Sequence, residues 1–245
     1  MRKLFVVVAA IGLAGPALAD GYETAASPTP MLVVSNWTGL YFGASVGWAQ
    51  DDIGWTYHDP SGAVADRPLA DQSTDSTVWG VHIGYQEQWG AFVAGVEATA
   101  SWTDSDFGST PCFNVAFNCE ARKQGTEFTI GPRLGWTPAR AWLFYATGGY
   151  ASASVETREV LAATGAVNQF STQERQDGWY IGGGVDYALT PNWIVGVDYR
   201  HTEYDDEFHN STVNVEHRNI SLDSDAVRAR ISVKIDPPDR RGPLK

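Results

Sequence analysis

The sequence of 245 residues is short of basic side chains, cysteine, methionine and long apolar runs. It carries 17 Lys and Arg against 29 Asp and Glu, a net charge of −12 at pH 7, and two residues each of cysteine and methionine. The acidic balance excludes a nucleic-acid partner, which needs clustered basic groups to replace phosphate counterions. No stretch after residue 20 is apolar for the roughly 20 residues that a membrane-spanning helix needs, so such a helix is excluded there.

The first 20 residues hold a short apolar run with a basic start. Arg2 and Lys3 precede an apolar stretch that ends at Leu13, and Ala17-Leu18-Ala19 follows. This order is typical of a secretory signal peptide with an Ala-x-Ala cleavage site, so we expect residues 1–19 to be removed on export. An N-terminal anchor helix is the alternative, but the run is far shorter than the roughly 20 residues that span a bilayer.

The whole sequence is rich in residues that favour strands, with 25 glycines and 10 tryptophans. In eight segments, large apolar side chains alternate with small or polar ones, which is typical of strands with one apolar and one polar surrounding. The fifth segment contains Leu143-Phe144-Tyr145-Ala146, which leaves its facing open. The segments are Leu40–Ala49, Trp79–Gln86, Phe92–Trp102, Glu127–Trp136, Trp142–Ser154, Trp179–Leu189, Trp193–Thr202 and Val227–Ile235.

The connections between these segments alternate strictly between long and short. Residues 51–75 form the first long connection and residues 87–90 the first short one. This rhythm is typical of an up-and-down barrel with short periplasmic turns and long outer loops, whereas a soluble β-sandwich has no reason to keep it. The sequence therefore predicts an all-β fold, an eight-stranded antiparallel up-and-down transmembrane β-barrel over residues 37–235. We expect a periplasmic leader at 20–36 and a periplasmic tail at 236–245.

Tryptophans gather at the two ends of the predicted strands. Two such rings are typical of aromatic belts at the two bilayer interfaces. The alternative, core tryptophans of a soluble barrel, would place them in the middle of the strands. The ring near the short turns is Trp37, Trp89, Trp136, Trp142 and Trp193, and the other is Trp48, Trp79, Trp102 and Trp179.

Charged residues lie on the small-residue face of the strands. A charge on the lipid face costs about 2–4 kcal/mol at the bilayer midplane, so this face must line the interior. Eight strands leave room for little more than side chains, and we expect a paired polar network there. The expected neighbours are Glu97 and Glu127 near Arg133, and Asp186 and Asp198 near Arg200, Arg228 and Arg230. A charge-lined ion path is the alternative. The network residues are His82, Glu97, Glu127, Arg133, Asp186, Asp198, Arg200, Arg228 and Arg230, with Lys234 beyond them.

The sequence contains no recognisable catalytic motif. It has no nucleophile elbow, because its Gly43-Ala44-Ser45-Val46-Gly47 lies inside an alternating strand segment and not at a strand-to-helix turn. It also has no His-Glu-x-x-His and no phosphate-binding glycine loop before a helix. We therefore expect no enzymatic activity and no catalytic, cofactor or metal site, the alternative being acid–base chemistry at His82. The long connections are acidic, and Asp205, Asp206 and Glu207 in one of them lack the spacing of a calcium loop.

The two cysteines are Cys112 and Cys119. An exported chain meets an oxidising compartment, so we expect them to form a disulfide that stabilises the fold by about 2–3 kcal/mol. Metal ligation by the pair is the alternative, but two further ligands at matching spacing are not visible.

Several segments carry a family resemblance, among them Asn36-Trp37-Thr38-Gly39-Leu40-Tyr41-Phe42-Gly43 and Trp79-Gly80-Val81-His82-Ile83-Gly84-Tyr85. These segments resemble the small porin-like outer-membrane proteins of alphaproteobacteria, a group that includes the outer-membrane immunogenic proteins. The resemblance implies an OmpA-like barrel inserted by the outer-membrane assembly machinery, in contact with outer-membrane lipid and lipopolysaccharide. It also implies roles in envelope integrity and surface contacts. One departure is that Ile235 replaces the usual terminal aromatic residue, and residues 236–245 follow it.

Some members of this group bind haemin, which leaves a second function open. A narrow porin, or a barrel that binds haemin or another small ligand at the surface, is the alternative to a structural role. The candidate outer ligands are His58, His201, His209 and His217.

Overall fold

A computed structural model describes residues 36–58, 67–104, 108–111, 116–170, 174–210 and 217–235. The predicted signal peptide, nearly all of the leader and the C-terminal tail lie outside these ranges. The described residues contain no helix that is long and apolar enough to cross a membrane. The strands are β1 Gly39–His58, β2 Arg67–Trp89, β3 Phe92–Asp104, β4 Gly108–Pro111, β5 Phe117–Ala139, β6 Trp142–Leu161, β7 Val167–Phe170, β8 Glu174–Ala188, β9 Trp193–Asn210 and β10 His217–Ile235.

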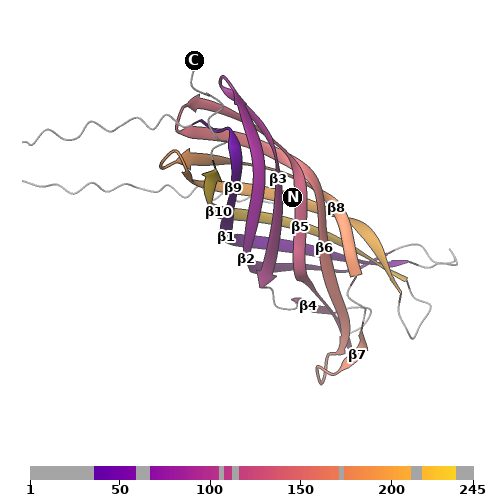
Figure 1. Cartoon of the computed structure of the whole chain (residues 1–245). Coiled ribbons are helices and arrows are strands. Elements are labelled where there is room, and N and C mark those ends of the chain that lie inside the picture. Colours follow the sequence, from indigo (N-terminus) through magenta and orange to yellow (C-terminus); the bar gives the residue numbers. More distant parts are fainter. Residues whose placement is uncertain are drawn as a thin grey trace, which may run out of the picture. The chain divides into compact units, whose positions relative to one another are not determined.

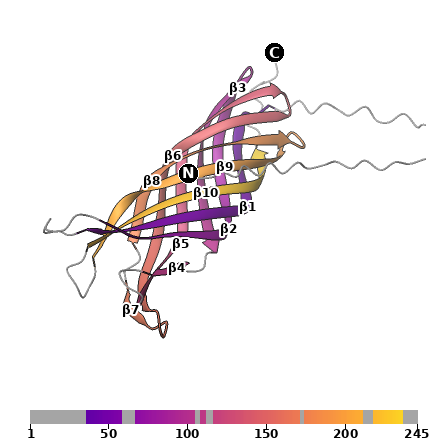
Figure 2. The ribbon, with the colours of Figure 1, turned by 180° about the vertical axis from the view of Figure 1, so that it is seen from behind.

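Eight of the strands form a closed antiparallel ring (Figures 1 and 2). The order is β1-β2-β3-β5-β6-β8-β9-β10, and β10 pairs with β1 to close the ring. Each long strand therefore pairs with its neighbours along the chain, which confirms the predicted up-and-down barrel. The short strands β4 and β7 add to the free edges of β5 and β6 where these two strands extend beyond the ring.

Side chains alternate between the outside and the inside of the ring. In β1, Phe42 is 47% exposed on the outer surface, whereas its neighbour Tyr41 is 1% exposed inside. The facing of β6, which the sequence left open, is now clear. Leu143 and Tyr145 point inward, and Phe144 points outward. Glycine at position 84 makes room for Tyr41, because a Cβ there would collide with the tyrosine hydroxyl.

The strands are longer than the sequence predicted at one end, which we call the extended end. The predicted loop 51–75 is wrong, because β1 continues to His58 and β2 begins at Arg67. Beyond Trp48, the apolar residues of β1 change to the inward positions, where Ile53 and Trp55 are buried. Water replaces hydrocarbon around this part of the barrel, so the polarity of the two faces inverts. The prediction of a loop at Asp205, Asp206 and Glu207 is also wrong, because β9 continues through them to Asn210.

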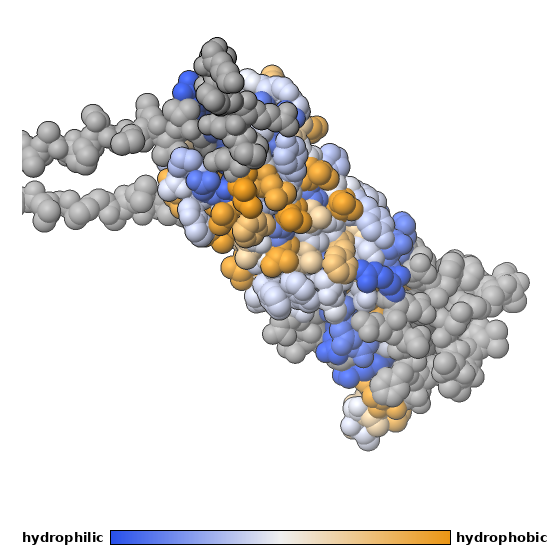
Figure 3. All heavy atoms as spheres, in the orientation of Figure 1, coloured by the Kyte–Doolittle hydropathy of each residue, from blue (hydrophilic) through white to orange (hydrophobic). Residues whose placement is uncertain are grey.

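The outward apolar side chains form a band around the barrel (Figure 3). Exposed tryptophans lie near the two ends of the strands, at the edges of this band. At the extended end, Trp79 stacks on Trp102 with ring centroids 4.6 Å apart. The prediction that Trp37 belongs to the aromatic belt is wrong, because this side chain is 0% exposed and lies inside the barrel. It precedes β1, and its backbone N–H donates to Gln88 Oε1 (2.9 Å) while its carbonyl accepts from Gln86 Nε2 (2.9 Å). These bonds hold the residues just before β1 in the mouth of the barrel at the short-turn end.

Candidate functional site in the barrel interior

The middle of the barrel is filled by charged side chains. All nine residues predicted for the interior network point inward, and none is more than 8% exposed. Lys234 also points inward, close to the short-turn end, where its ammonium donates to the Asn36 carbonyl. The nine residues are His82, Glu97, Glu127, Arg133, Asp186, Asp198, Arg200, Arg228 and Arg230.

Arg230 occupies the centre of this network. Its guanidinium donates to Glu97 Oε2 (2.6 Å), to Asp198 Oδ2 (3.3 Å) and to the Tyr145 hydroxyl (3.0 Å). Glu97 also accepts from the Tyr41 hydroxyl (2.9 Å). A carboxylate and a guanidinium buried together need this number of partners, because an uncompensated buried charge is costly.

Arg133 and Arg228 surround the central arginine. Arg133 donates to Asp186 Oδ2 (2.5 Å), and its guanidinium lies 3.7 Å from the ring centroid of Tyr145. Arg228 makes a bidentate pair with Asp198, with both bonds at 2.9 Å. Bidentate pairs of this kind are short, directional and difficult to replace by lysine.

Arg200 differs from the other three interior arginines. Its Nη1 donates to Thr129 Oγ1 (2.6 Å), and its guanidinium lies 4.5 Å from the Tyr180 ring centroid. Within the described residues it forms no ion pair with a carboxylate. Asp186 and Asp198 pair with Arg228 and Arg230, as the sequence predicts, and also with Arg133, but not with Arg200.

Glu127 also has a partner that the sequence prediction missed. It pairs with Lys123 rather than with Arg133, and Lys123 lies 3.8 Å from Asp51. The sequence prediction missed Lys123 because it lies before the predicted start of the strand. Lys123 and Glu127 are four residues apart, so they share the inward face once the strand is extended. Asp51 lies beyond the outer tryptophans, and burial raises its pKa while the Lys123 ammonium opposes that rise.

The histidines fall into different surroundings. His82 lies in the interior, where its Nε2 is 2.8 Å from Ser232 Oγ. His201 lies on the outer surface, where its Nδ1 is 2.8 Å from Asp225 and its ring is 6.1 Å from that of Trp179. The side chains of His58, His209 and His217 lie outside the described residues. No group of three metal-binding side chains occurs within the described ranges.

Two apolar clusters lie above and below the charged residues. The cluster at the short-turn end, which we call the lower plug, consists of Trp37, Val93, Leu143, Ala188 and Ile194. The cluster at the extended end, the upper plug, is larger, and includes Ile53, Trp55, Cys119, Ala121, Val155, Tyr180, Tyr204, Ile220 and Leu222. Sequence reasoning missed both plugs, although Val93 and Ile194 occupy the first inward position of β3 and β9.

The upper plug contains one of the two cysteines. Cys119 is disulfide-bonded and fully buried. Its predicted partner, Cys112, lies outside the described residues. The pairing of the two therefore stays a prediction, with Cys119 placed in the upper plug where β5 passes beyond the aromatic belt.

An eight-stranded antiparallel ring with an outward apolar band, aromatic edges and a charged interior is a transmembrane β-barrel. The chain belongs to the outer membrane protein beta-barrel domain family, which it matches over residues 5–218. It is therefore a protein of the bacterial outer membrane, as the sequence predicted.

Similar proteins support this placement and the predicted alphaproteobacterial resemblance. The chain is 25% identical over 186 residues to the 31 kDa outer-membrane immunogenic protein of Brucella melitensis, covering 69% of this chain and 71% of the relative. It is 24% identical over 179 residues to the 22 kDa outer membrane protein of Rhizobium leguminosarum bv. viciae, covering 73% and 70%.

Two solved structures have a similar fold. The outer membrane protein OprG from Pseudomonas aeruginosa superposes with a TM-score of 0.51 at 13% identity, covering 84% of this chain and 100% of that one. The outer membrane protease OmpT from Escherichia coli gives a TM-score of 0.51 at 9% identity, covering 80% and 97%. At these identities the likeness concerns the fold alone.

Proposed function

We propose that this outer-membrane barrel does not conduct ions and acts through its wall and its outer surface, in envelope integrity and surface contacts. The observation that carries the proposal is the presence of an apolar plug at each end of the charged interior. An ion that entered from either end would first lose its hydration shell among apolar side chains, which costs several kcal/mol or more. The network is then a brace between strands.

The charge pairing supports a bracing role. Arg230 of β10 bonds Glu97 of β3, and Arg133 of β5 bonds Asp186 of β8. These pairs cross the interior between strands that are not neighbours in the ring. Side chains that must hold such contacts are not free to coordinate a passing ion, so a narrow porin is the less supported alternative.

The extended end supports a role in surface contacts. Outer-membrane barrels keep their short turns in the periplasm, which places the extended end outside the cell. There the outward faces of β5 and β6 carry cross-strand ion pairs, Arg122 with Glu156 (2.8 Å) and Arg158 with Glu120 (2.6 Å). A stiff, water-exposed sheet above the membrane is suited to meet a partner at the cell surface. Haemin binding would depend on the four candidate histidines. Of these, the structure describes the side chain of His201 alone, on the outer face.

The proposal includes the absence of enzymatic activity. His82 and Ser232 are within hydrogen-bond distance, an arrangement that resembles a base beside a nucleophile. Both are nearly fully buried in the interior, between the two plugs. This burial favours a structural hydrogen bond over a catalytic pair.

Conductance in a planar lipid bilayer tests the proposal. Refolded protein at neutral pH should give no discrete current steps, while a porin refolded in the same way gives them. The double variant Leu143→Ala with Ile194→Ala removes two side chains of the lower plug and serves as a comparison for a thinned barrier. Regular single-channel steps from the unmodified protein would contradict a closed interior.

A further inference from the structure

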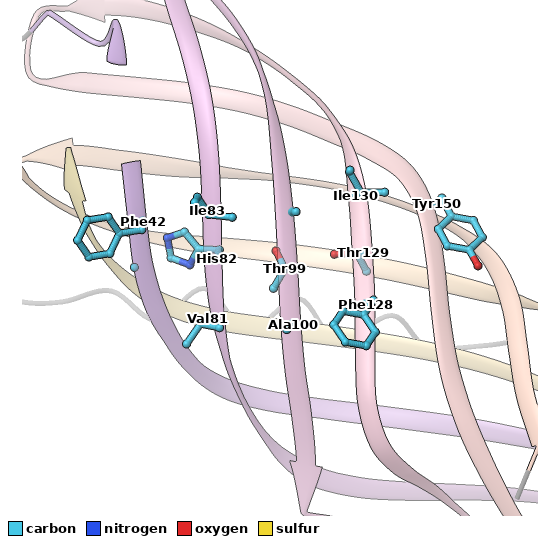
Figure 4. A pocket seen from close by; sticks show the side chains of 12 residues that line it. Phe42, Val81, His82, Ile83, Thr99, Ala100, Phe128, Thr129, Ile130 and Tyr150 are labelled. Carbon is cyan, nitrogen blue, oxygen red and sulfur yellow. The ribbon is translucent and has the colours of Figure 1, made fainter. Parts of the chain in front are cut away.

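A groove of 580 Å³ lies on the lipid-facing side of the barrel, across β1, β2, β3, β5 and β6 (Figure 4). Two cross-strand rows explain its shape, since each places an alanine of β3 between two larger side chains. In the first row, Ala100 of β3 lies between Val81 of β2 and Phe128 of β5. The second row pairs Ile83, Ala98 and Ile130 in the same way. The small side chains form the floor along β3, and the large ones form the walls.

The surroundings of the groove define what fills it. Its wall residues are outward and about half exposed, and they lie within the apolar band (Figure 3). In β3 the floor lies nearer to Trp102 than to Phe92, and therefore in the outer half of the bilayer. A groove in this position is filled by hydrocarbon, because water has no polar partners there.

A cation lies at the outer end of the groove. The guanidinium of Arg175 is 5.2 Å from the ring centroid of Phe128, which is a wall residue, and its Nε donates to Ser152 Oγ (2.8 Å). On the same side of the groove, the hydroxyl of Tyr150, which pairs across β5 and β6 with Ile130, donates to Asp177 (2.5 Å) and marks the change from apolar to polar surface. A guanidinium held at this height suits a phosphate group, to which arginine can donate two parallel hydrogen bonds.

We propose that this groove and Arg175 form a binding site for one phosphorylated lipid of the outer leaflet. One acyl chain lies over Ala98 and Ala100, between the walls of β2 and β5. The lipid phosphate accepts hydrogen bonds from Arg175 at the outer interface. The groove supplies shape and the arginine supplies charge, so the site distinguishes a phosphorylated lipid from a neutral one.

Native mass spectrometry of the full chain in mild detergent tests the site, with lipid A and dephosphorylated lipid A as the two probes. The unmodified protein should retain one lipid A and release the dephosphorylated form. Arg175→Gln should weaken retention of lipid A by about tenfold or more, the loss of a charge-assisted pair. Arg140→Gln, an exposed arginine in a short turn, is the matched control and should bind as the unmodified protein does.

A second variant tests the groove independently of charge. Ala100→Leu fills the floor and should weaken binding of lipid A, whereas Ala94→Leu on the same outward face of β3 lies outside the groove and should not. Heat-modified migration on gels establishes that each variant is folded. Equal retention of the two lipids, or unchanged binding by Ala100→Leu, would overturn the proposal. So would a dimer that Ala100→Leu dissociates, because the groove would then hold a second copy of the chain.

Discussion

Replacing Arg230 by methionine tests whether the interior network braces the barrel. The change keeps most of the side-chain length but removes a guanidinium that bonds Glu97, Asp198 and Tyr145. In the variant, Asp198 retains its bidentate pair with Arg228. Glu97 retains the hydrogen bond from the Tyr41 hydroxyl, but its nearest remaining cation is Arg133, at 3.7 Å. Glu97 is 4% exposed, and leaving a buried charge undercompensated costs about 3–5 kcal/mol.

Arg200→Met is the matched control for this experiment. Arg200 is equally buried but bonds Thr129 rather than a carboxylate, so its loss should cost about 2 kcal/mol. Urea unfolding in lipid vesicles, followed by tryptophan fluorescence, measures both variants. Adding Glu97→Gln to Arg230→Met should recover a large part of the lost stability, because the undercompensated charge is removed. Equal losses for the two arginines, or no recovery in the double variant, would refute the reasoning.

Two further predictions concern the ends of the barrel. Trp37→Ala should lower the free energy of unfolding by about 3–5 kcal/mol because Trp37 is fully buried, and Trp89→Ala, on the lipid-facing surface, should cost less in the same urea assay. Burial raises the folded-state pKa of Asp51, so the folded state holds this proton more tightly than the unfolded state. Stability should therefore fall as pH rises from about 4 towards neutrality. Asp51→Asn should remove that part of the pH dependence, and an unchanged pH profile would contradict it.

The membrane-spanning part of the fold was predictable because its two surroundings differ. Lipid requires apolar side chains such as Phe42 and Val46 outside, and the narrow interior requires small or polar ones inside. The facing of β6 was not predictable, since Leu143 of the lower plug makes both faces of the strand apolar. The extension of β1 to His58 was missed because Ile53 and Trp55 have the opposite facing to the apolar residues before them.

The members of the interior network were predictable, and so was part of their pairing, such as Asp198 with Arg228 and Arg230, but the partner of Glu127 was not. Charge must be inside the barrel, so a position on the small-residue face is enough to identify Glu127 as an interior residue. Its partner depends on where strands at different heights meet across the interior. In that geometry Lys123 forms an ion pair with Glu127. Arg200 instead donates a hydrogen bond to Thr129 and lies over the Tyr180 ring.

The change in facing at Trp48 fixes how deeply the protein sits in its bilayer. Sinking by four residues would bring the carboxylate of Asp52 to the level that Trp48 now holds, and rising by four would lift Val46 to the level of Gln50, outside the apolar band. Both displacements are unfavourable, so the chain has one preferred height to within a few strand residues. The wall above that height is packed around the upper plug, so side chains of its own interior stabilise it where lipid no longer surrounds it.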